Sequence, residues 1–487
     1  MNKPLRRVAV ACLALFGLLL LNVNLRQTVL ADGYRDNPRN SRVLVRNYER
    51  ERGSMALAGP GRPLIATSTE TQGRLKYLRS YPGKDLYAHV TGFYSLIYGQ
   101  AGLEDTEDQV LSGEDPRLLV DRLSDTLTGK EPRGGDVVVT LQEAAQRAAY
   151  AGLRGKRGAV VALDPRTGAV LAMVSAPSYD PNTLSSFDPT GIRASHAELT
   201  DADADDPLLN RAISRTYPPG STFKVITAAA ALESGVTPTT QVPSPTVLDL
   251  PQTTATLGNF GGSTCGDGTT SSLADAMRIS CNTAFAQLGL TLGEDAMREA
   301  AEAFGLNDDS VTVPQRVAAS TFPGDLDPPS LAQSAIGQRD VRVTPLQMAM
   351  VAAGVADGGT IMRPYLVREV QGPDLKSLSL AEPETYKQAV SREVADQLRT
   401  MMESVVSSGS ATSAQIPGVR VAGKTGTAQN APGAAPHAWF IGFAPAQDPR
   451  VAVAVIVENG GNAGNEATGG RVAAPIAKAV MQAVLGG

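Results

Sequence analysis

The sequence predicts an α+β fold, an antiparallel sheet covered by helices, and three observations support this class. Two apolar runs, at 158–163 and 169–174, flank Asp-Pro-Arg-Thr-Gly, a pattern typical of a β-hairpin. The segment 222–234 is apolar and rich in alanine, which indicates a buried central helix. Further strands are expected at 419–427, 437–444 and 451–458, with a closing helix at 473–485.

The N-terminus predicts a membrane anchor. Lys3, Arg6 and Arg7 precede an apolar run at 8–25, about the shortest length that spans a bilayer. The basic flank places the N-terminus in the cytoplasm and the rest of the chain outside it. A cleaved signal peptide, cut after Val-Leu-Ala at 29–31, is the alternative, but the run lacks a clear A-x-A cleavage site.

A chain of 487 residues is too long for one compact core, so we expect several domains. The predicted order is a cytoplasmic tail (1–7), the anchor (8–25), a non-catalytic domain (26–155) and a catalytic domain (156–487). The non-catalytic part begins with a polar, arginine-rich stretch at 36–55, which is either structural or binds phospholipid head groups. It then holds predicted strands at 63–67 and 134–141, predicted helices at 118–127 and 142–151, and a cluster of tyrosines expected in the core.

Composition limits the function classes. Hydrophobic residues make up 42% of the chain and the net charge is −5, which argues against a nucleic-acid partner. The histidines, His89, His196 and His437, lie far apart without ligand spacing, so we expect no metal and no cofactor. The segment 178–206, rich in Asp, Ser, Pro and Thr, is expected to be a loop or a poorly ordered excursion.

Three short motifs carry the chemistry: Ser-Thr-Phe-Lys at 221–224, Ser-Cys-Asn at 280–282 and Lys-Thr-Gly-Thr at 424–427. On a helix, Ser221 and Lys224 share nearly one face, so an amine lies beside a hydroxyl. The chain has no G-x-S-x-G sequence around Ser221, which argues against a Ser-His-Asp triad. Each motif alone fits an ordinary helix start, polar loop or sheet edge, but their single copies in this order indicate a serine nucleophile without histidine.

The cysteines are Cys12, Cys265 and Cys281. If Ser280 and Asn282 both face a site, Cys281 between them points elsewhere, where it could reach Cys265. Export from the cytoplasm makes a disulfide possible, so we expect a Cys265–Cys281 bridge, with two free thiols as the alternative.

The three motifs resemble those of penicillin-binding proteins, and the whole chain is similar to the class B (monofunctional) members of the PbpA type in actinobacteria. Further matching segments are Asn-Pro-Arg-Asn at 37–40, Arg-Gly at 52–53, Asn-Arg-Ala at 210–212, Gly-Gln at 337–338 and Thr-Pro-Leu-Gln at 344–347. The resemblance implies a single anchor, an elongated pedestal and a serine β-lactamase/transpeptidase-like domain of the penicilloyl-serine transferase family. The missing glycosyltransferase segment separates it from bifunctional class A proteins.

The resemblance also implies roles for the motif residues. Ser221 would be the nucleophile, activated by Lys224 or by another group, since the first proton acceptor is disputed in related enzymes. Lys224 can act as a base only if its pKa falls, which burial and repulsion from Lys424 would promote. The backbone amides of Ser221 and Thr427 would form the oxyanion hole.

The second and third motifs would handle the proton and the substrate. Ser280 would relay the proton to the leaving amine, and Asn282 would hold the substrate amide. The glycine of the third motif would let a substrate backbone come close. The third motif would supply the other substrate-binding residues: Lys424, Thr425, Gly426 and Thr427. The charge of its lysine and the hydroxyls of its threonines would bind the terminal carboxylate of the substrate.

The implied substrate is the D-alanyl-D-alanine end of a peptidoglycan stem peptide, on strands made from lipid-linked precursors. Acylation of Ser221 would release the last alanine, and a neighbouring stem amine would complete a cross-link, in elongation or in division. β-Lactams would imitate the donor. The expected partner is a membrane glycosyltransferase of the SEDS (shape, elongation, division, sporulation) family. The alternatives are a D,D-carboxypeptidase, a β-lactamase, a β-lactam sensor or a non-catalytic scaffold.

Overall fold

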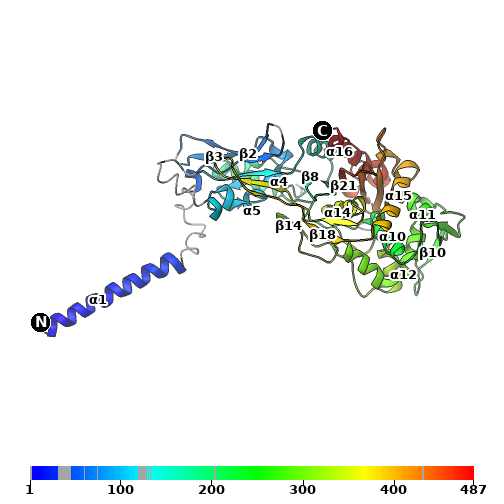
Figure 1. Cartoon of the computed structure of the whole chain (residues 1–487), viewed down its shortest axis with the longest axis horizontal. Helices are drawn as coiled ribbons and strands as arrows, with labels where there is room; N and C mark the ends of the chain where they lie inside the picture. Colours follow the sequence, from blue (N-terminus) through cyan, green and yellow to red (C-terminus); the bar gives the residue numbers. More distant parts are fainter. Residues whose placement is uncertain are drawn as a thin grey trace.

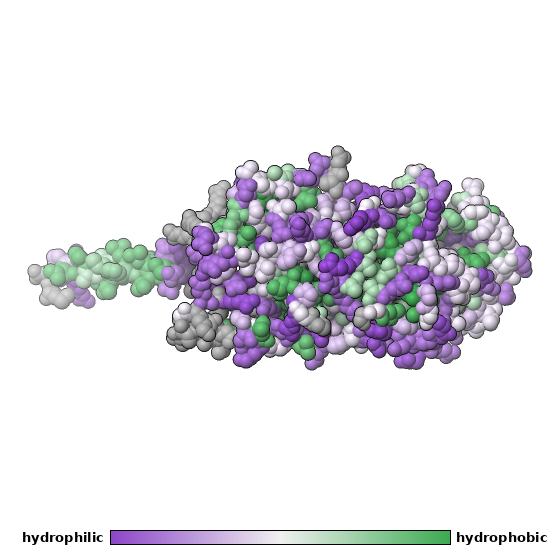
Figure 2. Space-filling view, turned by 90° about the horizontal axis from the view of Figure 1, so that it is seen from above, coloured by the Kyte–Doolittle hydropathy of each residue, from purple (hydrophilic) through white to green (hydrophobic). Residues whose placement is uncertain are grey.

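The computed structural model describes residues 3–30, 45, 47–59, 61–73, 75–118, 129, 131, 133–201, 205–429 and 433–486. Helix α1 (Lys3–Asn24), continued by a π-helical turn at Leu25–Val29, stands apart from an elongated body (Figure 1). Its apolar side chains are exposed, as the green surface of the helix in Figure 2 shows. With a mean hydropathy of 2.4, Lys3–Val29 is long and apolar enough to cross a membrane.

The catalytic half contains the predicted antiparallel sheet. Its strand order is β19-β20-β21-β7-β8 and every pairing is antiparallel. The predicted hairpin is confirmed as β7 (Gly158–Leu163) and β8 (Val170–Ala176). The late strands are β19 (Ala422–Ala428), β20 (His437–Ala444) and β21 (Val451–Val457). Because β19 is at the edge of the sheet, the Lys-Thr-Gly-Thr motif has one unpaired side.

Helices cover this sheet. Helix α14 (Pro345–Ala356) is buried at every residue and packs on β7, β20 and β21. The closing helix α16 (Ala474–Leu485) packs on β20, β21 and α8 (Glu143–Gly152). The central helix is α10 (Lys224–Glu233), preceded by a 3-10 turn at Gly220–Phe223. Ser221 therefore lies in that turn and not inside the α-helix.

The prediction of a loop at 178–206 was wrong. Part of this segment is helix α9 (Pro189–Leu199), preceded by a 3-10 turn at Pro181–Thr183. The carboxylate of Asp188 accepts a hydrogen bond from Thr190 N at 3.0 Å, and Pro189 occupies the first turn. Asp, Pro and Thr here start a helix, which is a position these residues favour as strongly as a loop.

A second sheet forms the pedestal, with strand order β17-β16-β6-β1-β2-β3. Four strands come from the N-terminal part: β1 (Met55–Leu57), β2 (Leu64–Glu70), β3 (Tyr77–Ser80) and β6 (Asp136–Val139). The other two, β16 (Val367–Gln371) and β17 (Ser377–Leu380), come from the catalytic segment and run back into the pedestal (Figure 1). Helix α8, before residue 156, packs instead on β8 and α16. Strands from beyond the expected boundary at 156 thus pack in the pedestal, and a helix from before it packs in the catalytic half.

The remaining elements are short, apart from the helices around the cleft described below. These helices are α11 (Leu273–Ile279), α12 (Asn282–Ala303), α13 (Pro328–Ser334) and α15 (Arg392–Ser408). The others are α4 (Ala88–Thr91), α5 (Leu103–Thr106), α6 (Asp108–Leu111), β4 (Tyr94–Ser95), β5 (Gly99–Gln100), β9 (Gln241–Pro243), β10 (Val247–Asp249), β11 (Thr256–Gly258), β12 (Thr270–Ser272), β13 (Thr312–Val313), β14 (Gln315–Arg316), β15 (Thr360–Met362) and β18 (Thr385–Gln388).

The pedestal core contains a buried charge cluster. Glu104 accepts hydrogen bonds from Arg52 Nε and Arg79 Nε, each at 2.6 Å. Tyr81 OH donates to the same carboxylate at 3.1 Å, and Tyr81 is buried, as predicted for the tyrosine cluster. Tyr98, another tyrosine of this cluster, is not in the core: it is exposed and stacks on the His196 ring. Residues 36–44, the first part of the polar stretch, and 119–128, most of one predicted helix, lie outside the described residues.

Candidate active site

The three sequence motifs meet at one cleft of about 820 Å³. One residue of the first motif, two of the second and two of the third line it: Ser221, Ser280, Asn282, Thr425 and Thr427. The two motif lysines are fully buried behind these residues. Segments far apart in sequence, namely the 3-10 turn before α10, the end of α11, the start of α12 and β19, therefore build one polar wall.

The position of Ser221 is set by its neighbour Gly220. Gly220 has a φ of +54°, and its N–H donates to Gly337 O at 2.8 Å. A Cβ at Gly220 would come within 2.8 Å of Thr427 O, so only glycine lets the turn approach the sheet edge this closely. Before the turn, Trp439 Nε1 donates to Pro218 O at 3.0 Å and fixes the turn to β20.

The Lys224 amine is directed at the second motif. It donates to Ser280 O at 2.8 Å and to Asn282 Oδ1 at 2.7 Å, and it lies 3.4 Å from Ser280 Oγ. Burial, and then the charge of Lys424, lower the pKa of Lys224 well below its ordinary value. Among the described residues, no hydrogen bond joins Ser221 Oγ to Lys224 Nζ. The Lys224 amine thus donates its hydrogen bonds to the second motif, Ser280 and Asn282, and not to Ser221.

Ser280 Oγ is shared by the two lysines. Lys424 Nζ donates to it at 2.8 Å and also donates to Thr425 O at 3.0 Å. Ser280 ends α11 in the left-handed conformation, with a φ of +64°, an unusual backbone that is often found at functional sites. Burial lowers the pKa of Lys424 to about 7. In the described part of the chain, no carboxylate forms an ion pair with Lys224 or Lys424.

Two residues of the third motif contact other parts of the chain. The Lys424 side chain is buried and does not line the cleft, and its amine donates to Ser280 Oγ and Thr425 O. Gly426 is also buried, and a Cβ on it would lie 2.8 Å from Pro219 O and 3.0 Å from Thr222 Cγ2. This glycine permits the close approach of the turn that carries Ser221. The predicted contacts of both residues with substrate stay predictions.

Polar residues of the cleft that sequence reasoning missed include Asn259, Ser410 and Gln338. Ser410 Oγ lies 2.6 Å from Thr425 Oγ1. The Gln338 amide donates to Thr427 O at 3.4 Å, and its Gly-Gln pair was noted only as a resemblance. No local pattern marks Asn259 or Ser410, because their partners lie far away in sequence.

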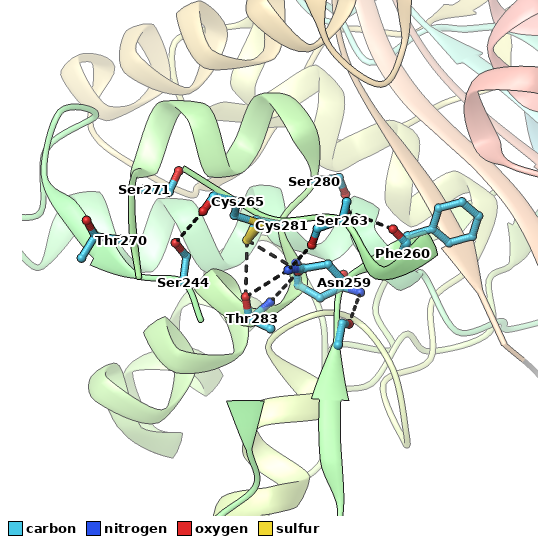
Figure 3. The surroundings of a disulfide bond; sticks show 12 residues. Ser244, Asn259, Phe260, Ser263, Cys265, Thr270, Ser271, Ser280, Cys281 and Thr283 are labelled. Atoms are coloured by element: carbon cyan, nitrogen blue, oxygen red, sulfur yellow. Dashed lines mark hydrogen bonds between the residues drawn. A yellow bond between two sulfur atoms is a disulfide. The ribbon is translucent and has the colours of Figure 1, made fainter. Parts of the chain in front are cut away.

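A disulfide joins Cys265 to Cys281, with an S–S distance of 2.09 Å (Figure 3). The sequence predicts this pairing, and the side chain of Cys281 points away from the cleft while Ser280 and Asn282 line it. The bridge ties the loop after β11 to the start of α12, next to the second motif.

A buried ion pair supports the segment before Ser221. Glu458 Oε1 accepts from Arg211 Nε at 2.9 Å and from Tyr217 OH at 2.7 Å. Arg211 and Glu458 are 1% and 3% exposed, so both charges are almost completely removed from the protein surface. Arg211 belongs to the Asn-Arg-Ala segment noted in the sequence, and its contact connects that segment to the end of β21.

Comparison with known proteins identifies the family. The family model described as penicillin binding protein transpeptidase domain matches residues 158–482, and that of the penicillin binding protein A dimerisation domain matches 52–137. The chain belongs to the class B penicillin-binding proteins of the PbpA type. Within this class, it is 51% identical to the peptidoglycan D,D-transpeptidase PbpA of Mycolicibacterium smegmatis, covering 100% of this chain and 99% of the relative.

Other class B penicillin-binding proteins give the same result. The PbpA of Mycobacterium tuberculosis is 48% identical over 100% of both chains. The structure of penicillin-binding protein A from M. tuberculosis as a ceftriaxone acyl-enzyme complex superimposes with a TM-score of 0.88 at 47% identity, covering 91% of this chain and 100% of the other. The predicted fold class, serine-type enzyme class and family are thereby confirmed for this penicillin-binding protein.

Proposed function

We propose that this chain cross-links peptidoglycan as a D,D-transpeptidase, through an acyl-enzyme on Ser221. The observation that carries the proposal is the convergence of three motifs on one cleft, where Lys224 contacts both Ser280 and Asn282. The D,D-transpeptidase relatives and the β-lactam acyl-enzyme structures support the same chemistry. Donor stem peptides and β-lactams would enter the cleft as alternative acylating agents.

Lys224 is the proposed base for Ser221. Burial lowers its pKa, which favours the neutral amine with the free lone pair that a base needs. In the absence of substrate the amine donates to Asn282 Oδ1. A substrate amide that binds Asn282 would compete for that oxygen and release the amine towards Ser221, since catalytic hydrogen bonds often tighten only with substrate bound.

Ser280 is the proposed proton relay. Its hydroxyl oxygen accepts from Lys424 and lies within reach of Lys224, which leaves its own hydrogen available for donation. After attack by Ser221, Lys224 would hold the serine proton. Ser280 would take that proton and pass its own to the nitrogen of the departing D-alanine. The acyl bond forms on Ser221 Oγ as the peptide C–N bond breaks.

The oxyanion hole is proposed at the backbone amides of Ser221 and Thr427. Thr427 O accepts from Gln338 rather than from β20. In an antiparallel pair, N–H and C=O of one residue point to the same side. The Thr427 N–H is thus expected on the open edge of β19, where it faces Gly220 and Ser221. The Thr425 and Thr427 hydroxyls, which line the cleft, are the proposed donors to the terminal carboxylate.

The apolar N-terminal helix fits a membrane-associated protein. We infer a single-pass topology, with the N-terminus in the cytoplasm and the catalytic domain outside, from the basic residues before the apolar run. A SEDS-family glycosyltransferase is the proposed membrane partner, on the strength of the family resemblance alone. Domain limits of 26–155 and 156–487 are retained as a proposal, with β16 and β17 added to the first unit and α8 to the second.

Labelling with a fluorescent penicillin tests the nucleophile. We expect the native protein to be labelled and Ser221→Ala to remain unlabelled, with the modified peptide mapping to residue 221. Ser234→Ala, at the far end of α10, which follows the turn of Ser221, is the matched control and should be labelled normally. Label on Ser221→Ala would reject the assignment. Incubation with stem peptides then separates the alternatives, because a carboxypeptidase releases D-alanine without cross-linked product.

A further inference from the structure

The loop after β11 carries one polar side chain that is nearly enclosed, that of Asn259, which is 9% exposed. Its Oδ1 accepts hydrogen bonds from Asn282 N at 2.8 Å and from Thr283 N at 3.1 Å. These are the first two amides of α12, which have no partner inside the helix. Figure 3 shows the Asn259 side chain reaching across to this helix start.

Helix α12 needs an acceptor from elsewhere in the chain because the residue before its first turn does not cap it. A helix is normally capped by a Ser, Thr, Asp or Asn immediately before its first turn. Here that position is Cys281, which makes no side-chain capping bond and is committed to the disulfide with Cys265. Asn259, more than twenty positions earlier in the chain, supplies the missing acceptor. The disulfide holds its loop against α12.

The orientation of the Asn259 amide is fixed by its other contacts. Its Nδ2 donates to Ser263 O at 3.1 Å and lies 3.4 Å from Thr283 Oγ1. The NH₂ group of the Asn259 amide faces Ser263 O and Thr283 Oγ1, while its carbonyl oxygen faces the first amides of α12. Only this orientation of the amide satisfies all of these partners. The side chain therefore acts as a rigid connection between the loop and α12.

The same loop also aims the side chain of Asn282. Asn282 Nδ2 donates to Gly258 O at 3.2 Å, which turns Oδ1 towards Lys224 Nζ at 2.7 Å. Residues 258 and 259 thus hold both the backbone nitrogen and the side-chain nitrogen of Asn282. The oxygen of that amide is thereby directed at the Lys224 amine.

We propose that Asn259 is a positioning residue for acylation, which acts by capping α12 and thereby setting the place of Asn282 and, through it, of Lys224. The inference rests on the proposed function, in which Asn282 and Lys224 serve the reaction of Ser221. Without the cap, the first two amides of α12 lose their shared acceptor, and Asn282 can turn away from the amine. Acylation then slows although Ser221, Lys224 and Ser280 are all present.

The test is the rate of acylation by a fluorescent penicillin, measured on the full-length protein in detergent. Asn259→Leu removes the acceptor at similar size and should acylate about tenfold more slowly, the effect of a lost cap of ordinary strength. Thr344→Val is the matched control, since it removes the buried cap of α14 and should lower the melting temperature without slowing acylation. An Asn259→Leu protein with the native rate would overturn the proposal.

A double-mutant cycle shows whether Asn259 acts through Asn282. In an Asn282→Ala background, Asn259→Leu should cause almost no additional slowing, because the side chain it positions is gone. An equal slowing in both backgrounds would overturn the positioning role. If Asn282→Ala itself acylates at the native rate, the proposed role of Asn282 fails instead, so the two failures are distinguishable.

A conservative variant keeps the test decisive if the leucine variant does not fold. Asn259→Asp retains an oxygen facing Asn282 N and Thr283 N, at a helix start that favours a negative charge. It should acylate within about threefold of the native rate, a difference well below that of a lost cap. A tenfold loss in a folded Asn259→Asp protein would contradict the capping role.

Discussion

Lys224 Nζ lies 2.7 Å from Asn282 Oδ1, although 58 residues separate them in sequence. The contact places the proposed base and the proposed substrate-binding amide in one hydrogen-bonded unit behind the cleft. It also means that the amine is not yet directed at Ser221. The predictions below follow from this unit and from the structures that support it.

Replacing Lys224 should abolish rapid acylation without abolishing the fold. Lys224→Met fills most of the space but carries no base, so acylation should fall by about 10² to 10⁴. Stopped-flow measurement with a fluorescent penicillin checks this rate. Lys387→Met, at a partly exposed lysine that donates to Glu302 O, is the control and should acylate normally. Native kinetics in the Lys224 variant would remove it as the base.

The buried Lys424 should make stability depend on pH. Its pKa is about 7 in the folded protein and about 10.5 when unfolded, so between these values the unfolded chain binds more protons. The free energy of unfolding should therefore rise as pH rises from 7 to 10, by at most about 1.4 kcal/mol per pH unit.

The comparison is urea unfolding of the native protein and Lys424→Met at pH 7, 8 and 9. The native protein should gain stability relative to the variant across this series. Below pH 7 the difference should be constant, because the lysine is then charged in both states. Parallel pH profiles for the two proteins would show that Lys424 keeps its ordinary pKa.

The disulfide should stabilise the fold and the second motif together. The two cysteines are 16 residues apart, and closing a loop of this size stabilises by about 3 kcal/mol. Cys265→Ser with Cys281→Ser should therefore lower the melting temperature and slow acylation, because the Asn259 loop is released from α12. Cys12→Ser, at the free cysteine of α1, is the control. Equal melting temperatures in all three proteins would exclude a stabilising bridge.

The Arg211–Glu458 pair should be far more important than an exposed pair. Glu458→Gln leaves the Arg211 guanidinium buried without a counter-charge, which costs about 3–5 kcal/mol. Glu466→Gln removes the exposed partner of Arg471 and should cost less than about 1 kcal/mol. Chemical denaturation of both variants measures the contrast, and similar losses would contradict it.

Gly426→Ala should separate the sheet edge from the nucleophile turn. The added Cβ would meet Pro219 O at 2.8 Å, and overpacking of this kind costs about 1–3 kcal/mol. We expect slower acylation, since the Thr427 amide and Ser221 would move apart. Gly73→Ala, where the nearest atom is 3.8 Å away, should leave acylation unchanged. Normal acylation by Gly426→Ala would show that the strand can shift without consequence.

The catalytic sheet was predictable because its strands carry local signals. The runs that became β20 and β21 are buried at every residue and are correspondingly apolar. The strand β16 has no such signal, since Val-Arg-Glu-Val-Gln mixes charges with apolar residues and is exposed in part. Its partner β6 lies far away in sequence, and only tertiary pairing determines that they meet.

The site was predictable as a set of residues but not as a set of contacts. The order of the motifs predicted that Ser221, Ser280 and Thr427 belong to one site, and all three line one cleft. No sequence rule gives the direction of the Lys224 amine, which depends on how Asn282 is held from the loop before it. For the same reason the cap from Asn259 was invisible, because the pattern for capping is local and this contact is not.

The return of β16 and β17 to the pedestal sheet means that the protein is not a series of modules that a single cut can separate. A fragment ending before residue 367 would leave the buried strand β6 as an open sheet edge, prone to pair with other chains. Exchanging pedestals between relatives would accordingly require three splice points: between β6 and β7, before β16 and after β17. Any force applied to the pedestal reaches the catalytic half through three separate stretches of backbone.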